Sequence, residues 1–104
     1  MFWTVSFVQR TTSLWLAVEK MYYVYFAKSI KNNKTYVGFT SKEPLHRVDE
    51  HNKGSNSWSK LNRPLKLIYF EEYKCKSDAI ARESFYKSGI GKRIKKAIIS
   101  EMDS

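Results

Sequence analysis

Two short runs of β-branched and aromatic residues, separated by a polar turn, constrain the fold of this chain most strongly. The runs are Tyr22–Phe26 and Thr35–Thr40, and Lys31-Asn32-Asn33-Lys34 lies between them. Asparagine tolerates the left-handed backbone of tight turns, so the pattern predicts a β-hairpin. Gly38 in the second run indicates a β-bulge, or a place where another backbone or a ligand comes close. The hairpin would set tyrosine hydroxyls of neighbouring strands side by side, although tyrosines that only cap a small core are the simpler interpretation of these residues.

A helix is predicted after the hairpin, from Pro44 to about Lys53. Ser41 can cap it, proline fits its first turn, and Gly54 is expected to end it. The following segment, residues 55–63, has no periodicity and is predicted to be a loop. Its Trp58 could stack on a nucleic-acid base, but we expect it to pack back on the domain.

A third strand is predicted over Leu65–Tyr73, directly after Pro64. A second helix begins at Ser77-Asp78, with the serine as its cap and the acid in its first turn, and continues to about Lys87. The resulting order is β-β-α-β-α-α. This order predicts an α+β domain with a small, three-stranded, mainly antiparallel sheet flanked by helices.

The last helix is expected after a glycine-containing break at residues 89–91. It would run from about Lys92 to Glu101. Its spacing predicts that the apolar residues Ile94, Ala97 and Ile98 are buried while its basic residues stay in water.

Residues 1–20 differ from the rest of the chain. They contain Trp3 and Trp15 but neither turn signals nor clean periodicity, and polar residues interrupt any signal-peptide pattern. We expect this stretch to be an upstream extension and the domain to span residues 21–104, beginning at Met21. The alternative is an extra edge strand or a short helix that lies on the sheet.

The charge of the chain indicates a polyanionic partner. It has 19 Lys and Arg against 10 Asp and Glu, a net charge of +9, and nucleic acid is the commonest partner of so basic a domain. A single cysteine, Cys75, excludes an internal disulfide, and with only two histidines it argues against a structural zinc site. No apolar run approaches the roughly 20 residues that span a bilayer. We therefore expect a soluble, cytoplasmic protein that does not contact a membrane.

Five residues could carry chemistry if the hairpin and the first two helices share one face of the sheet. They are the tyrosines Tyr23 and Tyr36, the helix pair Arg47 and His51, and the carboxylate Glu83. Arg47 and His51 are four residues apart and so project from one side of their helix. Glu83 lies on the apolar side of its helix, where a carboxylate must be paired or bind a metal. From spacing alone, a salt bridge from Glu83 to Lys87 is the simpler interpretation, and Arg47 could likewise be an ordinary surface cation.

The ordered set of motifs resembles the GIY-YIG nuclease family, in particular its small stand-alone bacterial members. Tyr23-Val24-Tyr25 occupies the first namesake motif and Tyr36-Val37-Gly38 the second, although Tyr23 stands where the family name expects glycine. Residues 45–52 resemble the arginine-bearing helix of the family, and residues 79–83 resemble the helix with its metal-binding glutamate. The resemblance covers residues 22–99, about four fifths of the chain.

The resemblance implies metal-dependent hydrolysis of DNA phosphodiester bonds. By analogy, Glu83 would hold a divalent cation, Mg²⁺ or Mn²⁺, and Arg47 would clamp the phosphate. Tyr23 or Tyr36 would help to deprotonate the attacking water, with His51 hydrogen-bonded nearby. The residues do not decide which tyrosine is the base.

The exposed basic residues are expected to bind the DNA backbone: Lys42, Lys53, Lys60, Arg63, Lys87, Lys92 and Arg93. The alternative to an enzyme is a non-catalytic nucleic-acid-binding module on the same fold, since positive charge supports phosphate binding and not cleavage itself. The chain shows no targeting domain, so a protein partner could supply specificity. The oligomeric state stays open.

Overall fold

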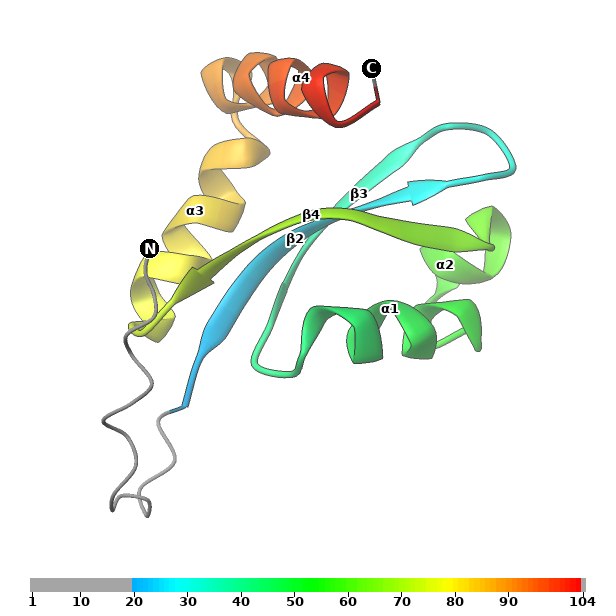
Figure 1. Ribbon diagram of the computed structural model, residues 1–104, viewed down its shortest axis with the longest axis horizontal. Coiled ribbons are helices and arrows are strands. Elements are labelled where there is room, and N and C mark those ends of the chain that lie inside the picture. Colours follow the sequence, from blue (N-terminus) through cyan, green and yellow to red (C-terminus); the bar gives the residue numbers. More distant parts are fainter. Residues whose placement is uncertain (1–19, 104) are drawn as a thin grey trace.

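The structure, a computed structural model, describes residues 20–103 (Figure 1). The predicted extension at residues 1–20 therefore lies, apart from Lys20, outside the described residues. The elements, in chain order, are β2 (Tyr22–Ser29), β3 (Thr35–Thr40), α1 (Pro44–Asn52), α2 (Ser57–Asn62), β4 (Leu65–Tyr73), α3 (Lys76–Tyr86) and α4 (Gly89–Asp103). The predicted α+β class and the order β-β-α-β-α-α are confirmed, with α2 as an addition.

The three strands form an antiparallel sheet in the order β3-β2-β4. The predicted hairpin is confirmed, and its turn contains Asn33 in a left-handed conformation with φ 63°. The register places Tyr25 of β2 opposite Gly38 of β3. An irregularity in the pairing of β2 with β4 lies at Phe26/Ala27, so Gly38 is not the site of the bulge.

Alternate residues of β2 face two different helical layers, because successive side chains of a strand point to opposite faces. Figure 1 shows α1 and α2 on one side of the sheet and α3 and α4 on the other. Val24 and Phe26 are buried with Ala79 and Tyr86 of α3. On the opposite face, Tyr25 is buried in a second cluster whose members are Tyr25, Ala27, Val48 and Leu65. The second cluster is the one that supports the candidate site.

Two predictions about the segment between β3 and β4 were wrong. Ser41 does not cap α1; the Glu43 carboxylate accepts the backbone N–H of Leu45 at 3.0 Å instead, because it is next to the helix start. The segment predicted as a loop contains α2, which begins with a capping box between Asn56 and Ser59. A six-residue helix is too short to show apolar periodicity, so the cap was its main sequence signal.

Trp58 of α2 packs on the domain as expected. Its ring centroid lies 5.2 Å from that of Tyr36. The helix therefore covers one edge of the Tyr25 cluster.

Two details of how the C-terminal helices begin also differ from prediction. The residue that precedes α3 is Cys75, with no side-chain cap, so Ser77 is not the cap. The glycine-containing stretch, residues 89–91, was expected to precede the last helix as a non-helical break. It forms the first turn of α4 instead. A side chain at Gly91 would meet the carbonyl oxygen of Phe85 at 1.6 Å, so this glycine allows α3 and α4 to approach each other.

The buried side of α4 is displaced from the predicted one. Ile98 and Ile99 pack against the core on the α3 side, whereas Ile94 and Ala97 are exposed. Among residues 20–103, no helix has the length and apolar character needed to span a membrane.

Candidate active site

A buried tyrosine–histidine pair stands at the centre of the face covered by α1. The Tyr25 hydroxyl lies 2.8 Å from Nε2 of His51, and both side chains are at most 1% exposed. The Tyr36 ring stands edge-on to the imidazole, with centroids 4.9 Å apart. Tyr25 was not among the predicted site residues, although it is the third residue of the first namesake motif and shares a face with Tyr36.

Gly38 makes room for this pair. A Cβ at this position would lie 2.5 Å from both Cζ and the hydroxyl oxygen of Tyr25, and 2.7 Å from Cε2 of Tyr36. The group that comes close to Gly38 is therefore a phenol ring of the neighbouring strand, and not the backbone or ligand that was expected.

Helix α1 supplies the histidine and an arginine to the same place. Arg47 lies one turn before His51, and its guanidinium partly opposes the rise that burial causes in the pKa of Tyr25. Its Nη1 donates to Oε1 of Glu50 at 2.8 Å. The far ring nitrogen of His51, Nδ1, lies 3.4 Å from Oγ of Ser55 and 3.4 Å from Nδ2 of Asn56. Both nitrogens of the ring thus have polar partners that fix its orientation.

Burial makes the pair neutral at pH 7. It raises the pKa of the Tyr25 phenol, and the Tyr36 hydroxyl and the Glu83 carboxylate raise it further, against the lowering effect of Arg47. Burial also lowers the pKa of His51, and the positive charge of Arg47 adds a smaller lowering effect. A neutral imidazole can accept a proton from a phenol at hydrogen-bonding distance.

Tyr23 occupies a different environment from the other predicted site residues. Its ring packs edge-on against Phe70, with centroids 5.9 Å apart. Burial raises the pKa of its phenol, and the carboxylates of Glu72 and Glu43 raise it further. The structure thus gathers Tyr36, Arg47 and His51 around Tyr25, while Tyr23 lies beside acidic groups.

Glu83 approaches the site from α3, on the other helical layer. Helix α3 contacts both β2 and β3, and the Glu83 carboxylate acts electrostatically on Tyr25. The side chain is 22% exposed, and its Oε2 lies 3.1 Å from Nζ of Lys87. The salt bridge between Glu83 and Lys87 that their spacing suggested is therefore present. A partly exposed pair of this kind contributes little to stability.

The donor set suits a cation that keeps most of its water. Among residues 20–103, no group of three or more His, Cys, Asp or Glu side chains could hold a metal ion. Mg²⁺ is often bound by one or two carboxylates, with waters and phosphate oxygens as the other ligands. The partly exposed Glu83 carboxylate fits this arrangement.

The residues predicted to bind the DNA backbone are all exposed but belong to both helical layers. On one side, Lys60 lies in α2 and Lys42, Lys53 and Arg63 lie beside α1 and α2, whereas Lys87, Lys92 and Arg93 belong to the α3–α4 side. Several already have acidic partners, such as Lys53, whose Nζ lies 3.1 Å from Oδ2 of Asp49. Their role in DNA binding therefore stays a prediction for residues of both layers.

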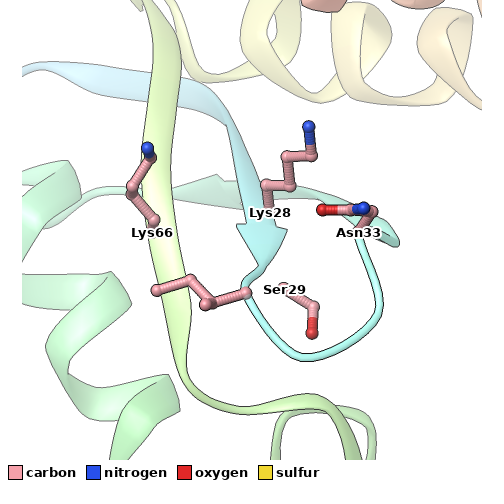
Figure 2. A pocket seen from close by; sticks show the side chains of 5 residues that line it. Lys28, Ser29, Asn33 and Lys66 are labelled. Atoms are coloured by element: carbon pink, nitrogen blue, oxygen red, sulfur yellow. The ribbon is translucent and has the colours of Figure 1, made fainter. Parts of the chain in front are cut away.

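A separate hollow of about 200 Å³ lies at the tip of the hairpin, where Lys28 and Lys66 extend from neighbouring strands (Figure 2). Ser29, Ile30 and Asn33 complete its lining. Strand alternation places Lys28 on the face of β2 opposite Tyr25. The hollow is therefore not part of the Tyr25 site.

Comparison with known proteins identifies the class to which this fold and site belong. The sequence profile described as the GIY-YIG catalytic domain matches residues 21–96, and the chain is a member of the GIY-YIG family. Nucleases of this family typically use divalent metal ions.

The chain is also similar to small bacterial proteins of the same family. The UPF0213 proteins of Staphylococcus aureus strains Mu3, N315 and MW2 are each 36% identical to it over 63 residues, which cover 60% of this chain and 74% of the relative. Their name states no activity. No solved structure matches the chain.

Proposed function

We propose that this protein is a metal-dependent endonuclease that hydrolyses phosphodiester bonds in DNA. The observation that supports this most strongly is the buried hydrogen bond between Tyr25 and His51, with Arg47 beside it and Glu83 within electrostatic reach. A structural core would gain more from apolar residues at these positions than from a phenol, an imidazole and a guanidinium. The +9 net charge suits a DNA substrate.

In this proposal Tyr25, and not Tyr23, is the first candidate for the general base. As the water attacks phosphorus, Tyr25 takes its proton and in the same step passes the phenol proton to Nε2 of His51, because burial of the pair opposes a separate phenolate. Arg47 favours this step because its charge stabilises the negative charge that develops on the phenol oxygen. Tyr36 packs against the imidazole and holds its ring in place. Tyr23 and Tyr36 stay as alternative bases.

Arg47 has a second task, which is to bind the reacting phosphate. A guanidinium matches a phosphate in shape and charge and stabilises the charge that develops on its free oxygens. Glu83 would hold Mg²⁺ or Mn²⁺, which, when bound, neutralises charge on the leaving oxygen. We further propose that the protein acts in the cytoplasm and that a protein partner supplies its specificity.

One observation favours the alternative of a non-catalytic DNA-binding module. The Glu83 carboxylate already has a cationic partner, since Lys87 Nζ lies 3.1 Å from it. If the carboxylate serves only that ion pair, the fold would bind phosphate through its basic residues without cutting.

A comparison of four variants tests the proposal, with plasmid, single-stranded and branched DNA as substrates and Mg²⁺ or Mn²⁺ as the metal. Glu83→Gln should abolish cleavage while DNA binding in chelator is kept or slightly tighter, because a negative charge near the phosphate is lost. Arg47→Ala should weaken both binding and turnover. Asp78→Asn, which removes the same charge from the exposed first turn of α3, is the matched control and should cleave normally.

Lys87→Ala completes the set. If the ion pair is the only role of Glu83, Lys87→Ala and Glu83→Gln should destabilise the protein alike. A wild-type protein that binds DNA but never cleaves it, with either metal and every substrate, would establish the binding module.

A further inference from the structure

One carboxylate on α1 gathers three basic side chains next to the candidate site. Oε2 of Glu50 lies 2.6 Å from Nζ of Lys42 and 3.3 Å from Nε2 of His46. Its other oxygen, Oε1, accepts a hydrogen bond from Nη1 of Arg47 at 2.8 Å. From the sequence, Lys42 was expected to bind the DNA backbone and Arg47 to clamp the phosphate. No role was predicted for Glu50.

The arrangement persists at every physiological pH. Hydrogen bonds from Lys42 and then Arg47 lower the pKa of Glu50 to about 2, so the carboxylate stays charged. Its charge balances only one of its two permanently cationic neighbours, so the cluster remains positive. Glu50 itself is 27% exposed, and so is Arg47. A ligand in solvent can therefore reach the cluster.

Stability alone does not account for such a cluster. Partly exposed ion pairs contribute little to folding, and holding long lysine and arginine side chains in one geometry costs conformational entropy. Without Glu50, Lys42 and Arg47 would repel each other and spread into solvent. The carboxylate keeps two cations adjacent, each bound to a different oxygen of the same group.

We propose that Glu50 is a positioning residue that pre-assembles a binding site for two successive phosphates of one DNA strand. Arg47 takes the reacting phosphate, and Lys42, held through the other carboxylate oxygen, takes the neighbouring one. Each nucleotide of a strand carries one phosphate charge, so a pair of adjacent cations matches two consecutive backbone positions. The inference rests on the proposed function for the reacting phosphate, but its DNA-binding part stands apart from cleavage.

A neighbouring residue of the same helix provides the matched control. Asp49 is largely exposed and pairs with Lys53, whose Nζ lies 3.1 Å away. Glu50→Gln and Asp49→Asn each remove one negative charge from α1. Both are compared by binding to a short DNA duplex in chelator over a range of salt concentrations, and by single-turnover cleavage with Mg²⁺.

Asp49→Asn should bind DNA as tightly as the wild type or tighter, with an unchanged cleavage rate constant. Glu50→Gln should lose about one unit of the slope of log K against log[salt], as expected for the loss of one phosphate contact. It should gain no affinity despite its higher net charge. Its cleavage rate constant should fall about 10-fold or more, because Arg47 is no longer held in place.

Lys42→Ala gives an independent measure of the proposed contact between Lys42 and a phosphate. It leaves Glu50 in place, so the ion pair between Glu50 and Arg47 is kept. Its side chain is half exposed, and it should reduce the salt slope by the same amount as Glu50→Gln. Combining the two substitutions should cause no further reduction, since both remove one contact. If Glu50→Gln folds poorly, the salt slope of Lys42→Ala alone still tests whether Lys42 contacts a phosphate.

Tighter binding of Glu50→Gln with an unchanged salt slope would overturn the inference, because Glu50 would then only repel phosphate. Additive slopes for Glu50→Gln and Lys42→Ala would do the same. Failure of the wild type to cleave DNA would overturn the proposed function while the salt slopes still decide the role of Glu50.

Discussion

Replacing Tyr25 by phenylalanine removes one oxygen atom from the centre of the candidate site. The ring remains, so the contact with Gly38 and the packing around the second cluster are kept. The lost hydroxyl leaves Nε2 of the fully buried His51 without its 2.8 Å partner. An unsatisfied buried polar group costs about 1–3 kcal/mol. For a domain of this size that corresponds to a fall in melting temperature on the order of 10 °C.

The effect on catalysis should be much larger than the effect on stability. Loss of a general base typically lowers a rate constant about 10²–10⁴-fold. We therefore expect single-turnover cleavage by Tyr25→Phe to fall by that factor at a temperature where the variant is fully folded. DNA binding in chelator should stay as in the wild type, because the role proposed for Tyr25 is to act on the attacking water, whereas Arg47 binds the phosphate.

Tyr23→Phe and Tyr36→Phe are the matched controls, since each removes one phenolic oxygen from the same face of the hairpin. Tyr23→Phe should retain cleavage, because its ring packs on Phe70 and not on the histidine. Normal cleavage by Tyr25→Phe, together with collapse of activity in Tyr23→Phe, would refute the assignment of Tyr25 as the base.

Two further substitutions test the supports of the site. Gly38→Ala should destabilise the protein by about 1–3 kcal/mol in urea unfolding and impair cleavage, because the added methyl group overlaps the Tyr25 ring; wild-type stability and activity would contradict the close approach. Glu71→Gln should cost about 1.5–3 kcal/mol, since charged hydrogen bonds from Arg82 and three tyrosines are weakened. Burial alone would raise the pKa of Glu71, but these hydrogen bonds lower it. Its stabilisation should therefore be complete above about pH 4.5 and be lost as the pH falls further, which Glu71→Gln should not show.

The elements with a strong local signal were predictable from sequence. The hairpin follows from two β-rich runs and an asparagine turn, and β4 has the predicted bounds, Leu65–Tyr73. Helix α2 could not be predicted by periodicity, because it has only six residues. The start of α4 was missed because glycine was taken as a helix breaker, whereas Gly91 is required by contact with the carbonyl of Phe85.

The site was predictable as a set of residue types but not as a geometry. Alternation along β2 puts Tyr23 and Tyr25 on the same face, so the pattern alone cannot distinguish them. The distinction comes from where α1 crosses that face, which places His51 above Tyr25. Likewise, the spacing of Arg47 and Glu50 allows an ordinary ion pair on the helix, and only the path of the preceding loop brings Lys42 to the same carboxylate.

The direction of Glu83 depends on residues that lie outside the site. Its neighbour Arg82 donates from Nε to Oε1 of Glu71 at 3.0 Å, and its guanidinium lies over the ring of Tyr86. Because consecutive residues of an α-helix point about 100° apart, fixing Arg82 against β4 also fixes the rotation of α3 about its axis. That rotation determines which way Glu83 projects toward the Tyr25 face. The partly buried Glu71 network on one face of the sheet thereby orients the carboxylate proposed to bind metal, while Lys87 pairs with it only weakly from the exposed side.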